Sequence, residues 1–179
     1  MSHLSSLPPA TTLLDAFRAF PEPVAPLLGL HETVMRGDSA LTPGQRELIA
    51  AYVSGLNDCG YCHGVHAATA RAFGVDEDVL AAALADLDSA PLEDGMKPLL
   101  HYVGVLTRSP SRVTEADAAA VAAAGWDDRA LYDAILVCAL FNFMNRVVEG
   151  VGIRADEAYA EVSGQRLHDV GYVGLSEVI

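Results

Sequence analysis

The sequence predicts an all-α protein, and three observations lead to this class. Alanine is abundant, and alternating runs of β-branched residues are absent. Apolar residues recur three and four positions apart, as at positions 13, 14, 17 and 20. Residues that cap helices precede several of these periodic segments, and glycine follows them. With 51% hydrophobic and 20% charged residues, the chain is typical of a globular protein.

The periodic segments predict nine helices joined by short breaks. Proline residues interrupt the chain after the first helix, and glycine residues end several of the others. The helices are expected over residues 11–20, 24–35, 43–56, 59–73, 77–87, 96–107, 115–124, 127–149 and 154–163. The tail over residues 165–179 contains Gly171 and Gly174, and we expect it to be extended or to wrap a neighbouring subunit.

The start of the helix over 43–56 is the most strongly signalled boundary. Thr42 can cap it, Pro43 suits the first helical position, and Gln45 lies three residues after Thr42, as in a capping box. In the next helix, Asp58 is expected to cap the start and Gly74 to follow the end.

Length and charge restrict the organisation and the partners. We expect a single domain over residues 1–179, with a core from about 20 to 165 and extended termini, because no low-complexity linker divides the chain. The net charge of -13 repels phosphate backbones and anionic membrane surfaces, so no nucleic acid or membrane partner is expected. The first residues lack a basic signal-peptide region, and the most apolar run, 134–144, is shorter than a membrane span. We therefore expect a cytoplasmic location.

The residues that carry chemistry gather around one turn. Cys59 and Cys62 form a C-x-x-C pair, and His66 follows one helical turn later. In a reducing compartment such a pair is typical of catalysis or metal binding rather than of a structural disulfide. If the helices on either side form an antiparallel hairpin, Glu47 lies level with His66, each about 14 Å from the turn. Cys62 lies on the same helical face as His66.

Each of the four residues has a use in thiol chemistry. The helix N-terminus favours the thiolate of Cys59, whereas His66 can take the proton of Cys62. Glu47 can orient His66 and stabilise its cationic form. A thiolate that attacks a peroxide becomes a sulfenic acid, and the second cysteine condenses with it to a disulfide. These arguments leave open which thiol attacks first.

The pattern Glu47-x11-Cys59-x-x-Cys62-x-x-x-His66 resembles the alkylhydroperoxidase D signature of the carboxymuconolactone decarboxylase-like superfamily. The segment 142–146, Asn-Phe-Met-Asn-Arg, resembles the Asn-x-x-Asn-Arg element of its peroxidase-related branch. The resemblance covers residues 20–165, roughly. One departure is Tyr61, because the type enzyme has a histidine immediately before its second cysteine.

The resemblance implies an alkylhydroperoxidase D-like helical bundle that assembles into trimers or hexamers. It implies an antioxidant peroxidase that reduces organic hydroperoxides, with Cys62 as the attacking and Cys59 as the resolving thiol, and without a cofactor or metal. It also implies a lipoyl-type or thioredoxin-like dithiol as reductant.

The same residues allow other interpretations. Cys59 to His63 reads C-x-x-C-H, the attachment motif of c-type haem, but this leaves Glu47 and His66 unexplained. For zinc, no second ligand pair completes a tetrahedral site. A redox-sensing or binding protein with a switchable dithiol and a carboxymuconolactone decarboxylase-like enzyme remain alternative functions. For other residues the expected roles are structural. We expect Cys138 to be a buried packing residue, and Asn145 and Arg146 to hold helices or subunits together.

Overall fold

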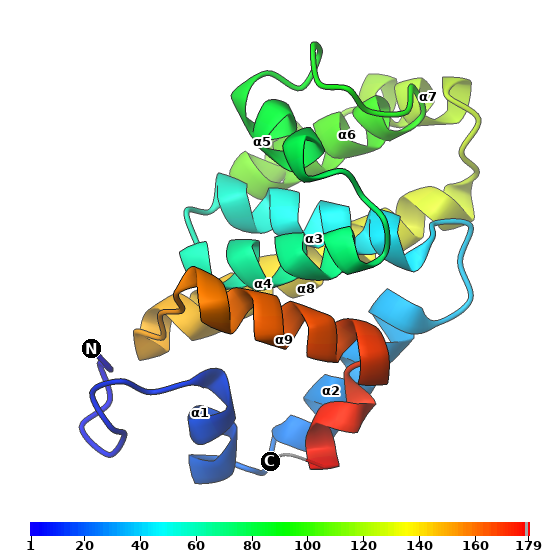
Figure 1. Cartoon of the computed structure of the whole chain (residues 1–179). Helices are drawn as coiled ribbons and strands as arrows, with labels where there is room; N and C mark the ends of the chain where they lie inside the picture. The colour runs from blue at the N-terminus through cyan, green and yellow to red at the C-terminus, as the bar shows by residue number, and fades with distance from the viewer. Residues whose placement is uncertain (178) are drawn as a thin grey trace.

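The computed structural model describes residues 1–177 and 179, and over these residues it confirms the all-α class. The described chain forms nine α-helices and two short 3-10 helices, without a strand (Figure 1). The α-helices are α1 (Leu13–Ala19), α2 (Val24–Arg36), α3 (Pro43–Leu56), α4 (Gly60–Ala72), α5 (Glu77–Ala85), α6 (Met96–Arg108), α7 (Glu115–Ala123), α8 (Asp128–Val151) and α9 (Glu157–Val170). The 3-10 helices are η1 (Pro110–Arg112) and η2 (Val173–Glu177).

The α3–α4 hairpin lies at the centre of the bundle. Helix α9 packs against α4, and α8 packs against α3 and α6. The helices α5, α6 and α7 lie at one end, whereas α1, α2 and the C-terminus lie at the other (Figure 1). The hairpin is therefore covered on several sides, and side chains on it can be removed from water.

The predicted capping box opens α3. The Thr42 side chain accepts a hydrogen bond from the Gln45 backbone N–H at 3.2 Å, and the Gln45 side chain accepts one from the Thr42 N–H at 2.9 Å. The expected cap at Asp58 is wrong, because Cys59 occupies the N-cap position of α4 and no side chain caps it. Asp58 instead turns the chain between the helices in the left-handed region, at φ 55°.

The expectation of an extended C-terminal tail is also wrong over the described residues. Helix α9 continues to Val170, because Leu167 extends its buried face, and it ends at Gly171 with φ 68°. The chain then returns as η2, which packs against α2 of the same chain, so the tail is folded rather than extended. Residue 178 of the expected tail lies outside the described residues.

Helix α8 is the long core helix. It buries Val137, Cys138 and Phe141 among other residues. Within the described chain it is the one helix long and apolar enough to cross a membrane, with a mean hydropathy of 1.5 over 18 residues. Its apolar residues are interrupted by polar ones, so no uninterrupted apolar run marks it in the sequence; core helices of soluble proteins have the same length and composition.

Candidate functional site

Glu47 and His66 meet across the α3–α4 hairpin, as their distances from the turn predict. Glu47 is completely buried, and its Oε2 lies 2.7 Å from Nδ1 of His66. An ionised carboxylate only accepts hydrogen bonds, so Nδ1 carries the proton. When the imidazole is neutral, its other ring nitrogen, Nε2, carries no proton and can act as a base.

Two further side chains bind the same carboxylate. Arg36 of α2 places Nη2 2.7 Å from Oε1 of Glu47, and the Tyr172 hydroxyl donates to that oxygen at 3.0 Å. Burial opposes ionisation of Glu47, but His66 and Arg36 outweigh it and hold the pKa of Glu47 below its ordinary value. The pKa of Tyr172 is raised well above its ordinary value by burial and by the charge of Glu47, so Tyr172 stays a donor.

The tail that carries Tyr172 is fastened to α2. The Glu32 carboxylate accepts hydrogen bonds from the backbone N–H groups of Tyr172 and Val173, at 2.7 and 3.1 Å. Gly171 has a positive φ, and a Cβ there would lie 2.8 Å from the Glu32 carboxylate. Both the backbone conformation and the close approach of Glu32 therefore favour glycine at this position. The guanidinium of Arg36 also lies over the Tyr172 ring, 5.0 Å from its centroid. Sequence reasoning missed Arg36 and Tyr172, since no spacing relates them to the hairpin.

The two thiols of the C-x-x-C pair lie together at the N-terminus of α4. Both cysteines are reduced and buried, Cys59 at 0% exposure and Cys62 at 3%. A hydrogen bond from the Cys62 thiol, which outweighs burial, and the Cys62 backbone N–H lower the pKa of Cys59. The same hydrogen bond, together with burial, raises the pKa of Cys62 well above its ordinary value. Cys59 is therefore the first of the pair to ionise in the resting protein.

Asn145 of α8 binds the turn of the hairpin and approaches the dithiol. Its amide donates to the Ser54 hydroxyl at 2.9 Å and accepts from the Asn57 amide at 2.9 Å. It thus joins helices, as predicted. A hydrogen bond from Asn145 also counteracts the rise in the pKa of Cys62. Asn145 therefore contributes to the thiol site, whereas the sequence predicted only a structural role for it. Arg146 is exposed and bonds Asn142 of its own helix.

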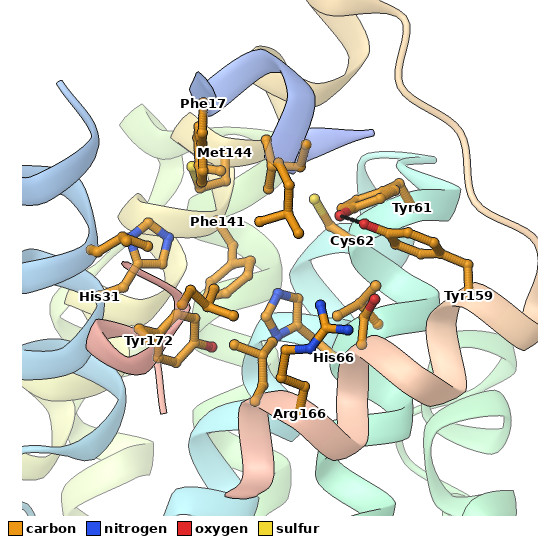
Figure 2. Close-up of a pocket in the computed structure, with 17 residues that line it drawn as sticks. Phe17, His31, Tyr61, Cys62, His66, Phe141, Met144, Tyr159, Arg166 and Tyr172 are labelled. Atoms are coloured by element: carbon orange, nitrogen blue, oxygen red, sulfur yellow. Dashed lines mark hydrogen bonds between the residues drawn. The ribbon is translucent and has the colours of Figure 1, made fainter. Parts of the chain in front are cut away.

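Cys62 and His66, one turn apart on α4, both line a cavity of about 70 Å³. Figure 2 shows the Cys62 sulfur and the His66 imidazole pointing toward its interior. No hydrogen bond joins these two side chains in the part of the chain that the structure describes. The proton path expected from Cys62 to His66 is therefore not continuous in this structure, and a molecule bound in the cavity could complete it. Cys59 does not line the cavity.

Of the other residues near the hairpin, some line the cavity and others only pack within the fold. His63 turns away and bonds the Ala51 carbonyl at 3.1 Å. Tyr61 lines the cavity, with its hydroxyl 3.2 Å from that of Tyr159. Cys138 is buried beside Thr107, as predicted. His31, which the sequence did not single out, lines the cavity, and burial lowers its pKa to about 4.

The fold and the site define a class of all-α proteins with a dithiol and a glutamate–histidine pair on one helical hairpin. Residues 21–95 match the carboxymuconolactone decarboxylase family. This match, over less than half of the chain, and the structural neighbours described next support placing the chain in the superfamily of carboxymuconolactone decarboxylase and alkylhydroperoxidase D proteins. No curated protein matches the chain.

Three solved structures illustrate the range of this fold. An uncharacterized peroxidase-related protein from Silicibacter sp. TM1040 is 28% identical, with a TM-score of 0.76, covering 83% of this chain and 78% of that one. A second such protein, from Ralstonia eutropha JMP134, described as an alkylhydroperoxidase AhpD core, is 24% identical, with a TM-score of 0.77 and 86% and 80% covered. The debrominase Bmp8, solved with 2,3,4-tribromopyrrole, is 14% identical, with a TM-score of 0.70 and 84% and 79% covered.

Proposed function

We propose that this protein is a thiol-dependent peroxidase that reduces organic hydroperoxides. The observation that carries the proposal is the cavity that Cys62 and His66 line together. Each of these residues has a hydrogen-bonding partner that can take part in the reaction: Cys59 for the Cys62 thiol and Glu47 for the His66 imidazole. A hydroperoxide in the cavity can reach both a nucleophile and an acid–base group.

The attacking thiol in this proposal is Cys62, because it lines the cavity and Cys59 does not. Cys59 is the thiol of the pair that ionises first, and the Cys62 thiol donates a hydrogen bond to the thiolate that results. Movement of that proton from Cys62 to Cys59, along the existing hydrogen bond, places the thiolate on Cys62. Asn145 then stabilises the charge on the Cys62 sulfur. The two thiols therefore have one proton between them before attack.

In the first step the Cys62 thiolate attacks the distal oxygen of the hydroperoxide, and the O–O bond breaks. The sulfur becomes a sulfenic acid, and the departing alkoxide takes a proton from the cationic His66 to leave as an alcohol. Glu47 stabilises the cationic form of His66 before this transfer, because its carboxylate bonds Nδ1. The proton on His66 is the one that the dithiol lost.

In the second step Cys59 condenses with the sulfenic acid. A Cys59–Cys62 disulfide forms, the S–O bond breaks, and the hydroxyl leaves with the Cys59 proton as water. An external dithiol of the lipoyl or thioredoxin-like type then reduces the disulfide and becomes oxidised itself. We also propose a cytoplasmic homo-oligomer, a trimer or hexamer, which light scattering of the purified protein tests.

The test is steady-state consumption of cumene hydroperoxide with dihydrolipoamide as reductant. We expect Cys62→Ser to abolish turnover, because the remaining thiol does not reach the cavity. The matched control is Cys138→Ser, which changes a buried cysteine outside the cavity and is expected to retain turnover. Wild-type turnover in Cys62→Ser contradicts the mechanism.

Two alternatives give different results in related assays. A redox switch is favoured by the burial of both thiols, which restricts access of a reductant to the disulfide. Such a protein loses two thiols per chain to one equivalent of hydroperoxide, but it does not turn over repeatedly. A carboxymuconolactone decarboxylase-like enzyme retains lactone decarboxylation in a Cys59→Ser, Cys62→Ser double variant.

A further inference from the structure

The cavity beside Cys62 has two chemically different walls. Helix α9 contributes Tyr159, Ser163 and Arg166, which lie four and three residues apart and therefore share one face of the helix. The facing wall is apolar and includes Phe17 of α1 and Met144 of α8. A ligand that fits this cavity has an apolar body and a polar group on the side of α9.

Arg166 is a half-buried cation without a partner in the described part of the chain. It forms no ion pair or hydrogen bond there, and the same is true of the Ser163 hydroxyl. Arg108 and Arg112 also lack such partners, but both are exposed to solvent. With 24 acidic and 11 basic residues, the chain has an excess of carboxylates, yet none is placed on Arg166. Figure 2 shows the Arg166 side chain extending from α9 toward His66.

A guanidinium of this kind is suited to a carboxylate. Its planar N–H groups match the two oxygens of a carboxylate, and the pairing is stronger where water is reduced. The Ser163 hydroxyl, one turn earlier on the same wall, can donate a further hydrogen bond. A ligand carboxylate bound there would also offset the charge that His66 acquires.

We infer that the cavity binds a small organic hydroperoxide that carries a carboxylate. The carboxylate binds Arg166 and Ser163, the apolar body packs against the wall of α1 and α8, and the peroxide lies between Cys62 and His66. The volume of about 70 Å³ favours a small apolar body. The substrate class rests on the proposed peroxidase function, whereas the carboxylate site itself does not.

The first experiment compares cumene hydroperoxide with its 4-carboxy derivative, which share one skeleton. We expect the wild type to prefer the carboxylate by about tenfold in kcat/KM, as one charged hydrogen-bonding pair provides. In Arg166→Gln we expect the two values to become about equal. Arg112→Gln, which removes an exposed arginine outside the cavity, is expected to keep the wild-type preference.

A second experiment measures binding without turnover, by calorimetry on the reduced protein with 4-isopropylbenzoate and 4-isopropylbenzamide. We expect the benzoate to bind more tightly than the amide and Arg166→Gln to lose that difference. If the amide binds equally well, or if the wild type consumes both hydroperoxides equally, the inference is overturned and the peroxidase function stands. If neither hydroperoxide is consumed but the benzoate binds through Arg166, the peroxidase function fails and the carboxylate site stands.

Discussion

The two ends of the site are held in different ways. At the charged end, Glu47 is bonded by His66 of α4, Arg36 of α2 and Tyr172 of the C-terminal tail. At the thiol end, Cys59 and Cys62 lie within one turn of a single helix and bond each other. The charged end thus depends on segments that are far apart in the sequence, whereas the thiol pair is arranged by local helical geometry.

This difference separates stability from chemistry. A change at the charged end leaves buried charged groups without their partners, so it affects folding as well as activity. A change at the thiol end replaces one small buried atom and affects mainly the reaction. The predictions below test this division, beginning with the largest expected effect.

Cys59→Ser tests the thiol end, and we expect it to abolish repeated turnover with little change in stability. Cys62 can still attack a hydroperoxide once, but no resolving thiol follows, so the sulfenic acid accumulates. Trapping with dimedone and mass spectrometry should locate the adduct on Cys62. An adduct on another residue, or continued turnover with dihydrolipoamide, would show that the resolving role is wrongly assigned.

Glu47→Gln tests the charged end. The substitution removes the charge opposite Arg36 and His66, so we expect a loss of about 3 kcal/mol in the free energy of unfolding. We also expect kcat/KM to fall about a hundredfold, because the cationic form of His66 loses its partner. Urea denaturation and peroxide assays measure the two effects. Glu161→Gln, at an exposed ion pair with Arg71, is the control and should change neither appreciably.

The part of the site that lies within the α3–α4 hairpin could be predicted from the sequence. The pairing of Glu47 with His66 follows from regular helices and a short turn, over twenty residues of chain. The contacts of Arg36, Tyr172 and Arg166 depend on how distant helices pack, and no periodicity encodes that. Gly171 and Gly174 suggested an extended tail, but in the fold Gly171 instead allows the chain to return toward Glu32.

His31 makes the apolar surroundings of the site sensitive to pH. Burial lowers its pKa from the ordinary value of 6.5 to about 4, so the unfolded chain takes up this proton first as pH falls. Stability is therefore lost between pH 6.5 and 4, by about 2 kcal/mol on going from pH 7 to pH 5. Glu47, with its lowered pKa, contributes its loss only below its ordinary value of 4.5.

Urea denaturation at these two pH values measures the effect. We expect His31→Gln to lose about 2 kcal/mol less than the wild type between pH 7 and pH 5, whatever its stability at pH 7. His101→Gln, at an exposed histidine, should retain the wild-type difference. Equal pH dependence in His31→Gln and the wild type would mean that His31 takes up a proton without cost in the folded protein.

Tyr172→Phe is the mildest test of the charged end, because it removes one of three hydrogen bonds and leaves the ring in place. We expect about 1 kcal/mol of lost stability, the ordinary contribution of a buried hydrogen bond. If Tyr172 also positions Glu47 for His66, the acid limb of the kcat/KM profile moves, since the weaker support makes Glu47 easier to protonate. Tyr132→Phe, at an exposed tyrosine, is the control. An unchanged pH profile with the expected loss of stability would show that the tail only fastens the fold, and that Arg36 and His66 suffice to hold Glu47.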